Sequence, residues 1–134
     1  SKVELKEKKD RTEDAIYATK AALKEGIVAG GGAALLWASK KIEPTGVGEE
    51  ILLEAIKAPY KTILENAGLD FQDLNKKGWG IDVVTGKPVN MVKAGIIDPV
   101  LVTKSALKNA VSVVSTIISA DCVISNMRMN ESNQ

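Results

Sequence analysis

Three consecutive glycines, Gly30-Gly31-Gly32, are a candidate ligand contact, because backbone without Cβ atoms can approach a ligand closely. An apolar run that predicts a helix follows them, and the first N–H groups of a helix are free to bind an anion such as phosphate. The lysine and the serine or threonine of a P-loop are missing. The residues themselves therefore leave two interpretations open, a nucleotide contact or a plain turn between two helices, and the turn is the simpler one.

Two aspartates also suit phosphate or sugar chemistry. The carboxylate of Asp14 could orient or deprotonate a water that attacks a phosphate. It could equally lie in the first turn of a helix, where an acid is favoured by the helix dipole. Asp98 could accept hydrogen bonds from a ribose, or cap the helix that follows it, and these two roles are compatible. Spacing alone favours the structural role for both residues.

The remaining candidates are a short hairpin segment and one cysteine. Asp82, Val83 and Val84 could form the wall of a purine pocket or could be ordinary strand residues. Cys122 is the single cysteine and has no histidine or evident cationic partner, so a small buried side chain is expected rather than a nucleophile. The chain contains no histidine, which excludes His-based triads and the usual zinc sites, and no metal ligands are predicted.

Helices are expected to position most of these residues. The charged stretch 1–9 is typical of a solvated segment, and residues 10–26 predict a helix. Asp10 or Thr12 could cap its start, and Gly26 is a suitable C-terminal stop.

The middle of the chain predicts further helices separated by turns. Residues 27–32 are expected to form a turn, and residues 33–42 a second helix. Residues 49–68 predict a third helical run that contains Pro59. Because proline removes a backbone donor and clashes with the preceding turn, we expect a kink or two abutting helices there.

The last third changes character twice. Residues 71–77 predict a helical turn or two, and residues 78–91 predict a β-hairpin with its tip at 85–88. After that, Asp98 is a good N-cap and Pro99 suits the first position of a helix that runs to about residue 120. The apolar arc of this helix is so wide that burial on several sides is expected. Residues 122–125 predict a short edge strand.

Composition places the chain among globular proteins of mainly helical structure. It has 134 residues, a formal net charge of +1, 45% hydrophobic and 26% charged residues. Aromatic residues amount to 4%, and no basic field is present, so neither nucleic acid nor a membrane surface is an expected partner. No stretch is expected to span a bilayer and no signal peptide is evident. Composition and spacing alone indicate a mainly helical globular protein and leave nucleotide binding open.

Two long segments resemble group I (GroEL-type, sixty-kilodalton) chaperonins. They are VELKEKKDRTEDAIYATKAALKEGIVAGGGAALL at 3–36 and NMVKAGIIDPVLVTKSALKNAVSVVSTIISADCVISN at 90–126, and the region 43–79 is the most diverged. The resemblance implies a mainly α fold, the helical half of an equatorial domain with a small β-hairpin and a short C-terminal strand. It implies that residues 1–25 are the second segment of the intermediate domain and that residues 26–134 are the C-terminal half of the equatorial, ATP-binding domain.

The resemblance also implies roles for individual residues. Asp14 matches the ATPase aspartate, which swings onto the nucleotide with the intermediate domain and activates the hydrolytic water. Asp98 matches the carboxylate that binds the ribose, and Ile96 packs on the base. The other matches are to the glycine backbone that faces the nucleotide and to the hairpin that holds the adenine: Gly30, Gly31, Asp82, Val83 and Val84. Val83 and Val84 are bulkier than the family's usual residues there.

The family implies an ATP-driven machine that encloses and folds non-native proteins. Its sister subunits form two stacked seven-membered rings, and its apical domain binds a co-chaperonin lid and unfolded clients. The phosphate loop, the Mg²⁺ and K⁺ ligands and the apical domain lie in other parts of the family's chain. We therefore expect a C-terminal piece that is inactive alone, from the bacterial cytoplasm or an organelle matrix. The alternatives are a stand-alone helical scaffold or interaction module and, less consistent with the missing P-loop, a small nucleotide hydrolase.

Overall fold

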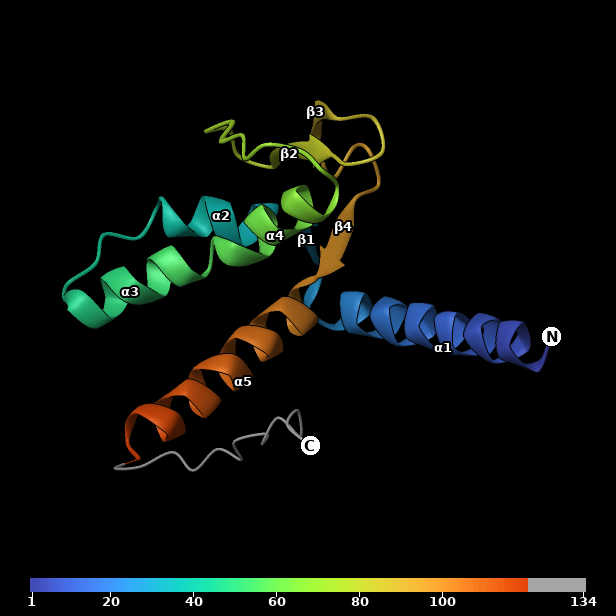
Figure 1. Cartoon of the computed structure of the whole chain (residues 1–134), viewed down its shortest axis with the longest axis horizontal. Coiled ribbons are helices and arrows are strands. Elements are labelled where there is room, and N and C mark those ends of the chain that lie inside the picture. Colours follow the sequence, from blue (N-terminus) through green and yellow to red (C-terminus); the bar gives the residue numbers. More distant parts are fainter. Residues whose placement is uncertain (121–134) are drawn as a thin grey trace, which may run out of the picture. The chain divides into compact units, whose positions relative to one another are not determined.

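The computed structural model describes residues 1–120 (Figure 1). Helix α1, Lys2–Glu25, begins at Lys2 rather than near Asp10, so the charged stretch 1–9 is helical. A capping box explains this start: the Ser1 hydroxyl accepts a hydrogen bond from the Glu4 N–H, and the Glu4 side chain accepts one from the backbone of residue 1. The predicted end of the helix is confirmed, because Gly26 caps it at φ 87°.

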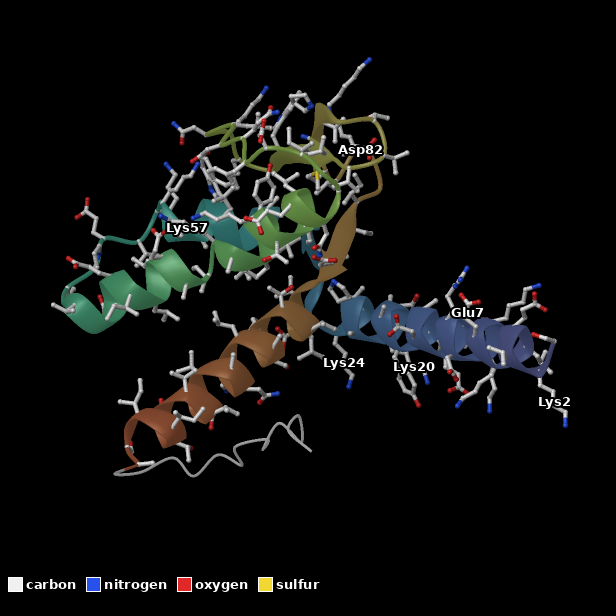
Figure 2. The ribbon with its side chains drawn as sticks, viewed as in Figure 1. Lys2, Glu7, Lys20, Lys24, Lys57 and Asp82 are labelled. Carbon is white, nitrogen blue, oxygen red and sulfur yellow. The ribbon has the colours of Figure 1, made fainter. Side chains whose placement is uncertain are left out.

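The exposed surface of α1 is stabilised by charges one turn apart. Arg11 pairs with Glu7, and the Lys9 Nζ lies 3.7 Å from the Glu13 Oε1. Charged side chains project along the helix, and none of its residues is buried (Figure 2). Residues 1–9 are therefore exposed to solvent, as predicted, but they are part of a helix.

The segment after α1 is a strand, which corrects the prediction of a plain turn. Strand β1, Ile27–Ala29, pairs antiparallel with β4, Ile97–Pro99, and Val28 lies opposite Asp98. The prediction that Asp98 and Pro99 begin a helix is also wrong, because both residues belong to β4 and helix α5 starts at Val100. Three-residue strands that are far apart in the sequence have no local periodicity by which they could be recognised.

The middle of the chain matches the predicted helices more closely. Helix α2 spans Ala33–Ser39, α3 spans Val47–Ala55 and α4 spans Ala58–Asn66. The interruption at Pro59 is confirmed as two abutting helices, with the proline in the first turn of α4, where its missing N–H costs nothing.

The predicted hairpin is confirmed, with a shifted tip. Strands β2, Trp79–Asp82, and β3, Lys87–Asn90, pair antiparallel and join through a turn at residues 83–86, so Lys87 and Pro88 are strand residues. The helical turns expected at 71–77 are absent, because residues 69–76 have no regular secondary structure.

One hydrophobic core joins the hairpin to α2 and α4. Tyr60 and Leu64 of α4, Ile81 of β2 and Met91 are each at most 3% exposed. The remaining buried members of this cluster are Ala29, Ala33 and Leu36. The core thus lies within the compact unit Ser1–Thr103, and a second unit begins at Lys104.

Helix α5, Val100–Ile118, has no buried residue, whereas burial on several sides was expected. Its 19 residues include an 18-residue window with a mean hydropathy of 1.2, so by length and composition it could cross a membrane, which corrects the expectation that no stretch would qualify. A core helix of a water-soluble protein satisfies the same criterion. The predicted strand 122–125 and Cys122 lie outside the described residues.

Candidate nucleotide-site elements

The first of the three glycines allows two backbone segments to approach each other. The Gly30 N–H donates a hydrogen bond of 3.0 Å to the carbonyl of Ile96. A Cβ at Gly30 would lie 3.0 Å from the backbone nitrogen of Ile97, closer than most side chains tolerate. The glycine therefore holds the end of β1 against the start of β4.

The last glycine of the run is also required by backbone packing. Gly32 adopts φ 77°, and a Cβ there would lie 2.6 Å from the backbone nitrogen of Tyr60. Only glycine allows α2 to begin this close to α4. Gly31, at φ 61°, lies between these two close approaches with Met91 beside it.

Asp98 lies next to this glycine loop. Its carboxylate is partly buried and accepts a hydrogen bond from the Gly31 backbone. Burial raises the pKa of the Asp98 carboxyl above its ordinary value, and the Gly31 hydrogen bond opposes that rise without cancelling it. A carboxylate has more acceptor sites than one backbone N–H uses, so Asp98 retains capacity to bind a hydroxyl. The fold thus brings together Gly30, Gly31, Ile96 and Asp98.

The hairpin residues form a separate group. The Asp82 Oδ1 accepts a hydrogen bond of 3.0 Å from the Val84 N–H, and its Oδ2 accepts one of 2.9 Å from the Thr85 hydroxyl. Asp82 therefore holds the turn at the end of β2 (Figure 2). The side chains of Val83 and Val84 are 42% and 90% exposed, respectively.

Met91 connects the hairpin to the glycine loop, a role that sequence reasoning missed. This residue is 2% exposed, and its Sδ would lie 2.9 Å from a Cβ at Gly80. Its Cε would lie 3.2 Å from a Cβ at Gly31. An isolated methionine between a hairpin and a turn gives no sequence signal for such a role.

Asp14 does not join the other predicted residues. It is exposed on α1, eleven residues before the end of that helix, or about 16 Å along the axis at the α-helical rise. No hydrogen bond or ion pair within the described chain links it to Gly31 or Asp98. Residues 1–120 also contain no group of three or more Cys, Asp or Glu residues placed to hold a metal ion.

The comparisons with known proteins agree with the helical fold. The model of the TCP-1/cpn60 chaperonin family matches residues 1–128. A solved structure described as a group III chaperonin in the open state matches with a TM-score of 0.65 and 29% sequence identity. The match covers 78% of this chain and 25% of the other, so the chain spans about a quarter of that protein's length. The family match over nearly the whole sequence shows that the chain belongs to the TCP-1/cpn60 chaperonin family.

Proposed function

We propose that this chain supplies the adenine and ribose side of the ATP site of a group I chaperonin subunit, a machine that encloses and folds non-native proteins. Membership of the chaperonin family supports the folding function in general. The observation that carries the ATP site is the contact between the Gly31 backbone and the partly buried Asp98 carboxylate. A hydroxyl-binding acid beside glycine backbone suits a ribose attached to phosphates.

Each residue has one task in this proposal. Asp98 binds the ribose hydroxyls, the backbone at Gly30 and Gly31 faces the phosphates, and Ile96 packs on the base. Because both Asp82 oxygens hold the hairpin turn, this residue acts by placing Val83 and Val84 against the adenine. ATP bound there would supply the phosphoryl group for hydrolysis.

Asp14 is the proposed catalytic aspartate, which positions and activates the attacking water. Its exposed place on α1 agrees with an acid that reaches the nucleotide only when its segment moves. We assign residues 1–25 to the intermediate domain and residues 26–134 to the equatorial domain. Mg²⁺ and K⁺ would be held by other parts of the subunit.

The proposed partners are those of the group I family. Sister subunits would form the double seven-membered ring, and the co-chaperonin lid and unfolded clients would bind through the apical domain. Neither nucleic acid nor a membrane is a proposed partner. The bacterial cytoplasm, or alternatively an organelle matrix, is the proposed location.

Titration of the isotope-labelled chain with ATP tests the proposal by NMR. Because this chain lacks a P-loop, we expect millimolar affinity at best and no magnesium-dependent turnover. Resonance shifts are expected at Gly31, Ile96, Asp98 and the turn 83–86. The Asp98→Ala variant should lose the shifts at Ile96, whereas Asp70→Ala, a change in the irregular segment, should retain them. Shifts confined to other residues would contradict the ATP site, and steady turnover would contradict the inactivity of the chain alone.

A scaffold or interaction module is the second candidate, and the exposed apolar side chains of α5 favour it. Such a module would bind a protein partner through α5 and would show no shift at Gly31 or Asp98 with ATP. The same titration therefore separates the two functions.

A further inference from the structure

A cavity of about 360 Å³ is lined by none of the candidate nucleotide residues. It lies between α2, the start of α4 and the irregular segment after α4. Its walls carry three lysines: Lys40 directly after α2, Lys57 directly before α4, and Lys61 in the first turn of α4. Its volume lies within the range of small-molecule sites, which begins at about 300 Å³.

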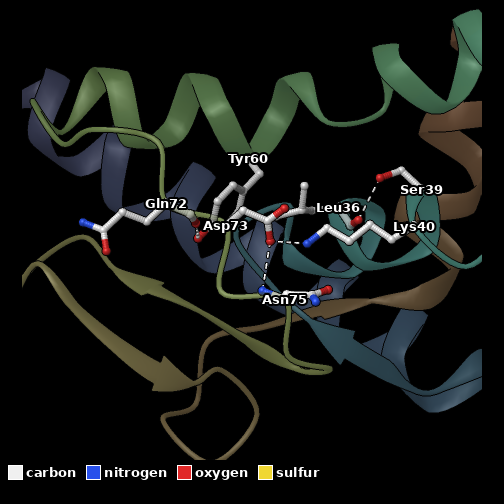
Figure 3. A network of polar contacts seen from close by, with 7 residues as sticks. All are labelled: Leu36, Ser39, Lys40, Tyr60, Gln72, Asp73 and Asn75. Atoms are coloured by element: carbon white, nitrogen blue, oxygen red, sulfur yellow. Dashed lines mark hydrogen bonds and ion pairs between the residues drawn. The ribbon is translucent and has the colours of Figure 1, made fainter.

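The cationic groups at this cavity outnumber their acidic partners. Lys40 reaches across to the Asp73 carboxylate, which also accepts a hydrogen bond from the Asn75 N–H (Figure 3). Lys57 and Lys61 share the single carboxylate of Glu54, and the Lys61 Nζ lies 3.4 Å from its Oε1. Three ammonium groups thus face two carboxylates, which leaves one positive charge without a counterpart in this cluster.

Two of the three lysines, Lys40 and Lys57, are partly enclosed by the protein, whereas the Lys61 side chain is 39% exposed. The side chains of Lys40 and Lys57 are 21% and 29% exposed, so the surrounding protein shields part of each charge. The pKa of the Asp73 carboxyl is lowered, chiefly by the hydrogen bond from Lys40, with a smaller contribution from the charge of Lys57. Lys57 and Lys61 both contact the Glu54 carboxylate, so their two ammonium groups lie close enough to act on one anion.

An apolar wall lies beside the charged groups. Leu36 and Phe71 line the cavity, and the Lys61 Nζ lies 5.5 Å from the centre of the Phe71 ring. Tyr60 supports that ring edge-on, at a centroid distance of 6.0 Å and an angle of 87°. The cavity thus pairs an excess of positive charge with the half-exposed ring of Phe71.

We propose that this cavity binds a small organic anion whose carboxylate or phosphate group contacts Lys57 and Lys61 and whose apolar or aromatic body packs against Phe71. A carboxylate and a phosphate satisfy the same ammonium donors. The site is independent of the ATP proposal, because the two have no residue in common.

Phenyl phosphate is a suitable probe, with phenol and inorganic phosphate as matched fragments. In NMR titrations of the whole chain at low salt, phenyl phosphate should shift resonances of Lys57, Lys61 and Phe71. It should bind several-fold more tightly than either fragment, and added salt should weaken it because the charges are screened.

Two substitutions in the same ion-pair cluster should act in opposite directions. Lys61→Gln removes the excess charge and should weaken phenyl phosphate by about five-fold, as expected for one partly exposed charge contact. Glu54→Gln removes the competing carboxylate and should tighten binding by a similar factor. Lys20→Gln, a matched change on α1, should leave the affinity unchanged. Circular dichroism of each variant verifies that the helices are intact.

Three results would overturn the proposal. Phenol binding as tightly as phenyl phosphate would reduce the cavity to an apolar surface, and equal binding of inorganic phosphate would exclude a role for Phe71. Affinities that are the same in Lys61→Gln and Glu54→Gln would show that the cluster does not hold the anion. Failure of ATP to bind the chain would leave the proposal intact.

Discussion

Gly32 and Gly48 differ in whether the fold has room for a larger side chain. Gly32 adopts φ 77° and faces the backbone of Tyr60, whereas Gly48 lies within α3 with no atom within 4 Å of the Cβ it lacks. Gly32→Ala should destabilise the protein by about 2 kcal/mol or more, from left-handed strain plus a backbone clash. Chemical denaturation measures this change in the free energy of unfolding.

Gly48→Ala is the matched control for that measurement. It should stabilise the protein by about 0.5–1 kcal/mol, because alanine has the higher helix propensity and the site is open. If both variants were equally stable, the close approach of α2 to α4 would be disproved.

Asp98 gives the stability of the protein a pH dependence of defined sign. Burial raises the pKa of its carboxyl in the folded state, so the folded state binds the proton more tightly than the unfolded one. The resulting stabilisation is complete below the unfolded pKa, near 3.8, and is lost as the pH rises through the folded value. Asp98→Asn keeps an oxygen acceptor for the Gly31 N–H and should abolish this pH dependence of stability, which is measured by urea unfolding at several pH values.

Asp73 should show the reverse slope and serves as the comparison. Its pKa is lowered, first by the hydrogen bond from Lys40, so its stabilisation is present above 3.8 and is lost as the pH falls through the folded value. Asp73→Asn should remove that loss on acidification. A common slope for the two variants would contradict the described environments of both carboxyls.

At the scale of elements, Met91 joins the hairpin to the glycine loop. Met91→Ala would leave a cavity beside Gly31 and Gly80 and should cost about 2–5 kcal/mol. Met91→Leu nearly preserves the volume and should cost less than about 1.5 kcal/mol. Equilibrium unfolding measures both, and a small loss in the alanine variant would show that the hairpin and the loop are not coupled through this side chain.

At the scale of the whole molecule, exposed apolar surface predicts self-association. Val113, Ile117 and Ile118 of α5 are 59%, 56% and 77% exposed. Burial of one such side chain against another copy of the chain stabilises the association by about 1.5 kcal/mol or more. Light scattering should show a mass that rises with concentration.

The double variant Val113→Lys with Ile117→Lys provides the control, because charges on α5 should oppose association and neither residue is a member of the core cluster. Its mass should stay that of a monomer over the same range of concentration. If the unsubstituted chain also stayed monomeric over this range, the prediction would be refuted.

The sequence by itself determined the elements that depend on local rules. Gly26 ends α1, Pro59 separates α3 from α4, and alternation with a turn forms the hairpin. Each follows from steric limits within a few residues. The chaperonin resemblance was equally a property of the sequence and agrees with the family match.

Tertiary structure decided what those elements do to one another. The pairing of β1 with β4 turned an expected turn and helix cap into strands, and it placed Asp98 beside Gly31. The packing of the chain also gives Gly30 and Gly32 their role, because both allow close backbone contacts. The same packing brings α2, α4 and a segment with no regular structure together around the lysine-lined cavity. Such contacts join residues distant in the chain, and local propensity and periodicity contain no information about them.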